Sequence, residues 1–221
     1  MRSSFDASFW AICLVSFFGM LRKSNLLVKS ARSFDASQQL LRSDFTFYSW
    51  GGLVTIRWSK TMQFRERVVR LPLSFVPDSP LSPVTAVKRA MHFTRKASPD
   101  SQAFAFLRSP DLVLMHFPYP LFLKKWRAIL SAIELSAKDY ACHSFRRGGA
   151  SFAVHSGVPV EHIKLLGAWP RMLCYFTLWS LFLLDCTLLI PSISPFSLQT
   201  IFSQPPQFGF WSVTNLLPDS F

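Results

Sequence analysis

Apolar residues near the N-terminus recur at spacings of three and four, which is the period of a helix with a buried face. The positions that carry this pattern predict one or two helices over residues 5–30: Trp10, Cys13, Leu14, Phe17, Phe18 and Leu21. The run 9–20 is apolar enough to resemble the core of a signal peptide. Asp6 interrupts the segment before it, and no small-residue cleavage site precedes Leu21, so a buried helix is the preferred interpretation.

Between residues 45 and 73 the pattern becomes that of short strands, rich in aromatic and β-branched residues. The segments FTFYSW and LVTIRWS flank Gly51 and Gly52, and a glycine pair between two such segments predicts a hairpin. The segment RERVVRLPL at 65–73 predicts a third strand. Pro72 either ends this strand or confines it to a sheet edge, because proline cannot donate a hydrogen bond to a neighbouring strand.

Four further helices are predicted after the strands. The first begins at Ser82-Pro83, a favourable helix start, and a short apolar segment at 103–107 follows it. The other three cover residues 120–136, with Leu123, Trp126, Ile129, Leu130 and Ile133 on the inner face, residues 144–155, closed by Gly157, and residues 159–167. The expected fold is therefore α+β: a mostly helical core with a small antiparallel three-stranded sheet among the helices.

The charge of the chain is high and unevenly distributed. The 221 residues carry a formal net charge of +12, and an excess of this size is typical of proteins that bind DNA, RNA or an anionic membrane face. All 24 Lys and Arg and 10 of the 12 Asp and Glu lie in residues 1–171, so this part has a net charge of +14 and residues 172–221 one of −2. The simpler alternative is that the charge serves solubility alone.

This contrast divides the chain into a domain, 1–171, and an irregular tail, 172–221. The tail is rich in Phe, Leu, Ser and Pro without a sustained period, which favours a disordered or weakly apolar segment unrelated to the domain. Residues 173–190 are a weak candidate for a membrane span, although Asp185 lies within them, so membrane association is the less favoured interpretation. The four cysteines have neither zinc-site nor disulfide-framework spacing, so we expect a reducing compartment.

The densest group of chemically capable residues is His143-Ser-Phe-Arg146-Arg147-Gly148-Gly149 at the start of a predicted helix. A spacing of three places His143 and Arg146 on one side of the first turn, where free N–H groups already favour an anion. Arginine adds a two-pronged donor for phosphate oxygens, and histidine can move a proton near neutral pH. The two glycines allow another backbone, or DNA, to approach closely.

The phrase HSFRRGGASFA, continuing to GVPVEHIKLLGAW, resembles the second motif block of tyrosine recombinases. It is most similar to the forms found in mobile elements of the Crypton and tyrosine-recombinase retroelement types. GMLRKSNL at 19–26 resembles the first block of that family, and Trp58-Ser59-Lys60-Thr61 lies where the family carries its catalytic lysine. Three blocks in the family's order are a more specific signal than any one of them.

The resemblance implies strand cleavage and rejoining in duplex DNA, and thereby DNA integration or recombination, with no metal and no small-molecule cofactor. It implies that Arg22 and Arg146 hold the non-bridging oxygens of the scissile phosphate, where extra charge develops in the transition state. Lys60 would protonate the leaving 5′-oxygen, His143 would assist proton transfer and Trp169 would pack against the phosphate. Arg65, Arg67 and Arg147 are expected to contact the DNA backbone.

This sequence differs from the family's pattern at the position of the nucleophilic tyrosine. The family's tyrosine follows the His/Trp position by eight to ten residues, but residues 177–179 are Thr-Leu-Trp and the one tyrosine beyond Trp169 is Tyr175. Tyr175 is therefore a displaced candidate nucleophile, and the alternative is a DNA-binding module that does not cleave. The family's preceding helical DNA-clamping domain is also expected to be missing. We further expect a nuclear or other intracellular location, and assembly of several copies on DNA.

Overall fold

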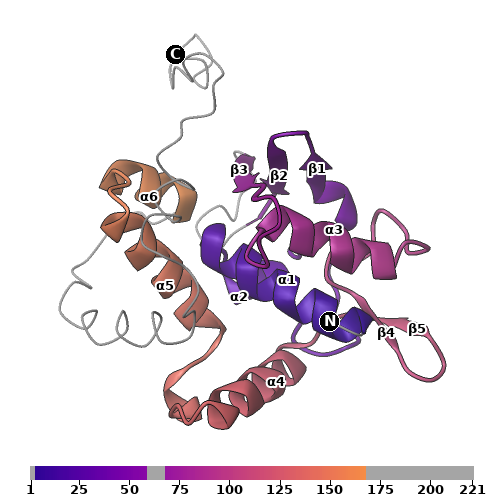
Figure 1. Cartoon of the computed structure of the whole chain (residues 1–221). Helices are drawn as coiled ribbons and strands as arrows, with labels where there is room; N and C mark the ends of the chain where they lie inside the picture. Colours follow the sequence, from indigo (N-terminus) through magenta and orange to yellow (C-terminus); the bar gives the residue numbers. More distant parts are fainter. Residues whose placement is uncertain (1–2, 59–67, 168–221) are drawn as a thin grey trace.

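The structure, a computed structural model, describes residues 3–58 and 68–167 (Figure 1). Its helices are α1 (Ser4–Phe18), α2 (Lys23–Leu26), α3 (Pro83–Phe93), α4 (Tyr119–Ala132), α5 (Cys142–His155) and α6 (Val160–Gly167), with short 3-10 helices at Arg42–Asp44 and Ala137–Asp139. Its strands are β1 (Phe45–Phe47), β2 (Gly51–Ile56), β3 (Val69–Ser74), β4 (Phe106–Arg108) and β5 (Val113–Met115). The predicted α+β class, a mostly helical core with a small antiparallel sheet, is confirmed.

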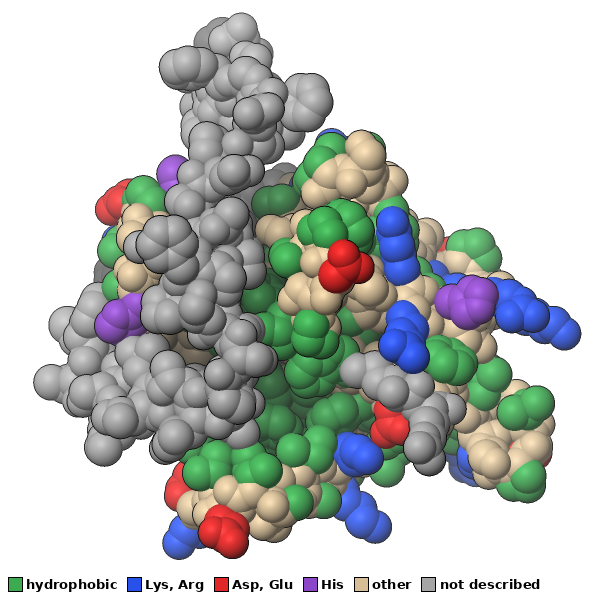
Figure 2. Space-filling view, in the orientation of Figure 1, with side chains coloured by type: hydrophobic (Ala, Val, Ile, Leu, Met, Phe, Trp, Pro, Cys, Tyr) green, Lys and Arg blue, Asp and Glu red, His purple; other side chains and the backbone are tan. Residues whose placement is uncertain are grey.

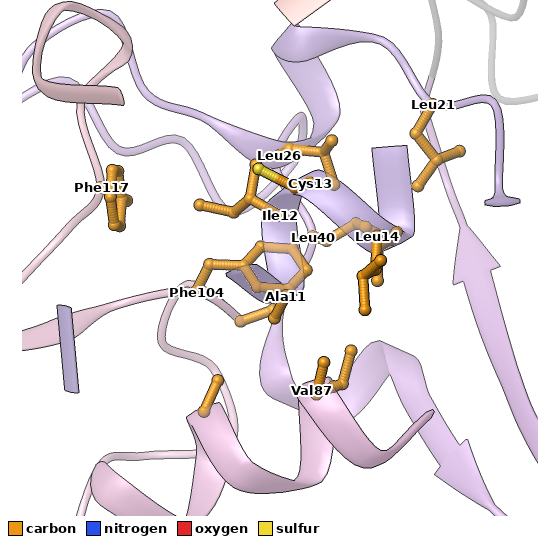
Figure 3. Close-up of a cluster of buried hydrophobic side chains, with 14 of the residues drawn as sticks. Ala11, Ile12, Cys13, Leu14, Leu21, Leu26, Leu40, Val87, Phe104 and Phe117 are labelled. Carbon is orange, nitrogen blue, oxygen red and sulfur yellow. The ribbon is translucent and has the colours of Figure 1, made fainter. Parts of the chain in front are cut away.

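Helix α1 lies at the centre of the core, between α3 and α5 (Figure 1). The side chain of Ser3 caps its N-terminus by accepting a hydrogen bond from the backbone N–H of Asp6. Its side chains are buried around most of the circumference, which confirms the buried helix that the apolar pattern predicts. In the close-up of the core, Ile12, Phe104 and Val87 lie together and come from three separate segments (Figure 3).

The three-stranded sheet is antiparallel in the order β1-β2-β3. The predicted hairpin and third strand are confirmed, since Gly52 in β2 pairs with Phe47 on one side and with Leu73 on the other. The position expected for the turn was wrong: the glycine pair lies inside β2, and residues 48–50 connect the two strands, with the Tyr48 N–H donating to the Gly51 carbonyl. Pro72 lies inside β3 opposite Leu53, and β3 is an edge strand of this sheet, so the edge position expected for the proline is confirmed. Leu71 and Leu73 bury one face of β3 against the core.

Two other features of the fold also differ from the sequence prediction. Residues 106–115 form a second, two-stranded antiparallel sheet, β4-β5, where a short apolar segment was expected. Helix α4 ends at Ala132 instead of residue 136, because Glu134 adopts a left-handed φ of 62° and its neighbour Leu135 donates to the Leu130 carbonyl. Placing Ile133 on the inner face was therefore wrong: it is 41% exposed.

Buried amides connect segments that regular hydrogen bonding does not join. Gln102 is fully buried; its Nε2 donates to the Leu26 carbonyl at 2.9 Å, and its Oε1 accepts from the Phe117 N–H at 2.6 Å. Asn25 Nδ2 donates to the carbonyl of Trp58 at 2.7 Å, where the chain leaves β2. These bonds fix the loops around α2, whose N-terminus carries Arg22 and Lys23. No helix within the described residues is long and apolar enough to cross a membrane, and residues 173–190 lie outside them.

Candidate functional site

A close backbone approach positions α5 against the C-terminal end of α1. A Cβ atom on Gly149 would lie 2.0 Å from the carbonyl oxygen of Phe17 and 2.8 Å from its carbonyl carbon, so only glycine fits. The rings of Phe17 and Phe152 pack beside this contact with their centroids 5.8 Å apart. The expectation that the glycine pair admits another backbone is thus confirmed at Gly149, and the backbone concerned is that of α1.

The turn after α1 receives the side chain of Arg146. Met20 has a left-handed φ of 48°, and its carbonyl oxygen accepts a hydrogen bond from Arg146 Nη1, although the two residues are 126 positions apart in sequence. Arg146 is only 3% exposed. Arg22 follows two residues after Met20 in extended conformation, at the N-terminus of α2. The turn therefore brings Arg22 to the same place as the first turns of α5.

Several positively charged side chains lie close together between the turn after α1 and the first turns of α5. Burial lowers the pKa of Arg146 to about 9, and the positive charge of Arg22 adds to the effect. Burial also lowers the pKa of Arg22. The side chain of His143 is exposed, yet its pKa is lowered. The largest cause is the partial loss of water around its ring, and the smaller causes are the positive charges of Arg146, Arg147, Arg22 and Lys23. We refer to Arg22, Lys23, His143, Arg146 and Arg147 as the cationic cluster.

Every charged group that shifts the pKa of His143 is thus a cation. An arrangement of this kind is unfavourable in the free protein, because like charges repel and burial removes the water that would screen them. An anion with several oxygens would reverse both costs. A histidine with a lowered pKa is neutral near pH 7, so it can accept a proton as well as donate a hydrogen bond. The cluster is therefore suited to holding an oxyanion and to moving a proton beside it.

Sequence reasoning did not single out Lys23, which the structure adds to the cluster. Its Nζ lies 4.3 Å from the centroid of the Tyr119 ring at the start of α4, which fixes the lysine over an aromatic face. The available signal was its position next to Arg22 within the segment 19–26. Cys142, the first residue of α5, is buried, and burial raises the pKa of its thiol to about 11. The thiol therefore stays protonated near neutral pH.

The described residues include part of the predicted site. The structure brings Arg22, His143, Arg146 and Arg147 together. The other predicted site residues lie outside the described residues: Lys60, Arg65, Arg67, Trp169 and Tyr175. The histidines outside the cluster lie elsewhere on the domain: His92, His155 and His162 are exposed, and His116 packs against Phe34 at a centroid distance of 4.4 Å.

Fold and site together define an α+β domain that gathers cations from two distant segments beside the first turns of one helix. No protein-family model matches the sequence, and no curated protein matches it either. Among solved structures, the chain is similar to one titled "FLP Recombinase-Holliday Junction Complex I", with a TM-score of 0.48 and 11% sequence identity. The similarity covers 81% of this chain and 42% of that one, so this chain spans less than half the length of its structural neighbour.

Proposed function

We propose that the chain binds duplex DNA through the cationic cluster, and that the cluster holds a backbone phosphate for strand cleavage and rejoining of the tyrosine-recombinase type. One observation carries this proposal. Arg22 lies in the segment that resembles the family's first motif block, and His143 and Arg146 lie in the segment that resembles its second. The two segments are far apart in sequence, yet the charges of Arg22 and Arg146 lower the pKa of His143, and the charge of Arg22 lowers that of Arg146.

The chemistry of phosphodiester cleavage gives each of these residues a task. Arg22 and Arg146 neutralise the non-bridging oxygens, whose negative charge increases in the transition state. Their mutual repulsion in the free protein makes the charge of the phosphate more favourable there than at an isolated arginine. His143, neutral near pH 7, accepts or relays the proton of the attacking hydroxyl. Arg147 contacts the neighbouring backbone.

The remaining predicted site residues stay proposals. Lys60 is the proposed general acid, and it lies two positions after Trp58, whose carbonyl Asn25 holds beside α2. Trp169 would pack against the phosphate, Tyr175 would be the nucleophile, and Arg65 and Arg67 would contact the backbone. A relation to integration by mobile elements, assembly of several copies on DNA, and a nuclear location belong to the same proposal.

A second candidate function is a DNA-binding module without cleavage. The observation that favours it is the sequence beyond Trp169: residues 177–179 are Thr-Leu-Trp, and the one tyrosine in that part of the chain is Tyr175. In this alternative the cationic cluster binds backbone phosphates in the same way. The two candidates therefore differ in the covalent step alone, in which a tyrosine oxygen attacks phosphorus and the 5′-oxygen leaves.

A nicked duplex that traps the covalent intermediate separates the two candidates. Recombinase activity predicts a protein–DNA adduct that resists denaturation and disappears in Tyr175→Phe. The control Tyr48→Phe removes only the hydroxyl of an exposed tyrosine far from the cluster in sequence, keeps its aromatic ring, and should leave the adduct unchanged. An adduct that persists in Tyr175→Phe would exclude Tyr175 as the nucleophile. Salt-dependent duplex binding with no adduct from the intact chain would support the non-cleaving module instead.

Arg146 and Arg147 provide a test of the cluster itself. Arg146→Ala should slow adduct formation by about 10²–10³-fold, the usual effect of removing one donor to a developing oxyanion, whereas Arg147→Ala should have a much smaller effect. If no adduct forms, the same order should hold for duplex affinity. Because Arg146 is buried, its alanine variant could lose activity through loss of stability alone. The second variant Arg146→Lys therefore keeps a cation at this position but removes the two-pronged geometry of the guanidinium. Equal effects of Arg146→Ala and Arg147→Ala would contradict the role given to Arg146.

A further inference from the structure

An exposed pair of stacked aromatic rings lies at the turn between β1 and β2. The ring centroids of Tyr48 and Trp50 are 5.1 Å apart and their planes differ by 7°. Both residues keep more than two fifths of their surface exposed, 44% for Tyr48 and 43% for Trp50. Phe75 is exposed to a similar degree, 42%, and lies at the same end of the sheet, because β2 begins at Gly51 opposite Ser74. The sheet therefore presents flat apolar rings to the solvent.

A basic helix face adjoins these rings. Gly52 approaches Val84 in the first turn of α3, and one turn later the Nζ atom of Lys88 lies 5.2 Å from the centroid of the Phe47 ring. From Lys88 onward the exposed basic side chains of α3 and the loop after it are Lys88, Arg89, His92, Arg95 and Lys96. Residues 79–99 contain no acidic residue. In the space-filling view, Lys, Arg and His side chains gather over this part of the molecule (Figure 2).

We propose that the Tyr48–Trp50 pair and the basic face of α3 form a binding surface for unpaired nucleotides of a single-stranded nucleic acid. Non-specific single-strand binding combines these two elements, a basic track for the backbone and aromatic rings on which bases stack. Bases inside a duplex are already stacked on both sides, so a flat exposed ring favours unpaired ones. The charge of α3 selects a polyanion over an apolar peptide as the occupant.

This surface is separate from the cationic cluster. Helices α3 and α5 both pack on α1, and Figure 1 shows them on different sides of it. The proposal therefore goes beyond the proposed function: it assigns a different form of nucleic acid to a different face, and it does not depend on strand cleavage. A chain with both surfaces would hold a duplex at α5 and an unpaired strand at α3.

Binding of a labelled single strand to the full-length chain tests the proposal. Fluorescence anisotropy would compare an oligo(dT) of about 20 nucleotides, the matching oligo(rU) and a duplex of the same length. Trp50→Ala should weaken oligo(dT) binding by roughly 5- to 150-fold, the factor that corresponds to loss of one stacked base, and change duplex affinity by less than about twofold. Trp50→Phe should retain most of the affinity. Weakening of oligo(rU) binding by the same variant would extend the surface to RNA, and its absence would restrict it to DNA.

Matched variants exclude simpler explanations. Leu112→Ala changes an exposed apolar residue beside the other strand pair and should leave all three affinities unchanged. Lys88→Gln should reduce the salt dependence of oligo(dT) binding, and Lys124→Gln on the exposed side of α4 should not. Circular dichroism would establish that each variant is folded. The proposal is overturned if Trp50→Ala leaves oligo(dT) binding intact, weakens duplex binding equally, or instead abolishes self-association in sedimentation, which would mark the rings as a contact between copies.

Discussion

Replacing Gly149 with alanine tests how α5 is held against α1. In an isolated helix this change would be favourable by about 1 kcal/mol, because alanine has the higher helix propensity. In this fold the new Cβ would lie 2.0 Å from the Phe17 carbonyl oxygen, whereas real Cβ atoms essentially never approach within 3.0 Å. Helix α5 must therefore move away from α1 by about 1 Å, because a backbone carbonyl in the last turn of a helix cannot rotate aside.

The magnitude follows from two opposing terms. Overpacking of this kind costs about 1–3 kcal/mol, and contact with rigid backbone places Gly149→Ala near the upper end of that range. The gain in helix propensity offsets about 1 kcal/mol. We therefore expect the free energy of unfolding to fall by about 2 kcal/mol. The same displacement moves Arg146 away from the Met20 carbonyl and from Arg22, so duplex binding should weaken as well.

Urea denaturation followed by circular dichroism measures the first effect, and the midpoint should fall without a change in slope. The control is Ala128→Gly on the exposed side of α4, which should cost about 1 kcal/mol through propensity alone and leave DNA binding intact. The sign decides the outcome. If Gly149→Ala raises the free energy of unfolding by about 1 kcal/mol, helix propensity governs this position and the close approach of α5 to α1 is wrong.

Two further predictions concern pH and the buried amide. Because the pKa of His143 lies below its ordinary 6.5 and a bound phosphate favours the protonated ring, duplex affinity should rise as pH falls from about 7.5 to about 5.5. His143→Gln should reduce this slope in anisotropy titrations, and an unchanged slope would remove His143 from the interface. The free energy of unfolding of the DNA-free protein should change with pH in the opposite direction to the duplex affinity. The unfolded chain binds the His143 proton more readily than the folded chain, so the contribution of His143 to stability falls as pH drops through 6.5. Gln102→Leu leaves the Leu26 carbonyl and the Phe117 N–H unpaired and should lower the free energy of unfolding by roughly 2–6 kcal/mol. Gln38→Leu, at an exposed glutamine, should change it by less than about 0.5 kcal/mol, and a similar loss in both variants would refute the bridging role of Gln102.

The sequence was sufficient to predict the ends of helices where the interaction that ends them is local and involves a residue type that favours it. The helix start at Ser82-Pro83 is confirmed, with the Ser82 side chain accepting from the Thr85 N–H. The end of α5 is confirmed too, because Gly157 takes the left-handed φ of 78° that glycine adopts without strain. The end of α4 has the same closure, but Glu134 occupies the left-handed position. Glutamate carries no signal for that conformation, so the period predicted a helix that was too long.

The candidate site divides in the same way. The segments around Arg22 and around His143 and Arg146 were recognisable from sequence as phosphate-binding candidates. The family resemblance assigned Arg146 to the phosphate and Arg147 to the DNA backbone, and the structure adds a physical difference between them: Arg146 is buried against the Met20 carbonyl, whereas Arg147 is half-buried. The sequence did not identify Lys23 as part of the cluster. Residue type and spacing thus determined which residues could bind a phosphate and where the helices beside them begin and end, because propensities and capping act over a few residues. Only the tertiary structure decided which cations meet, because their meeting depends on the contact between Gly149 and the backbone of α1.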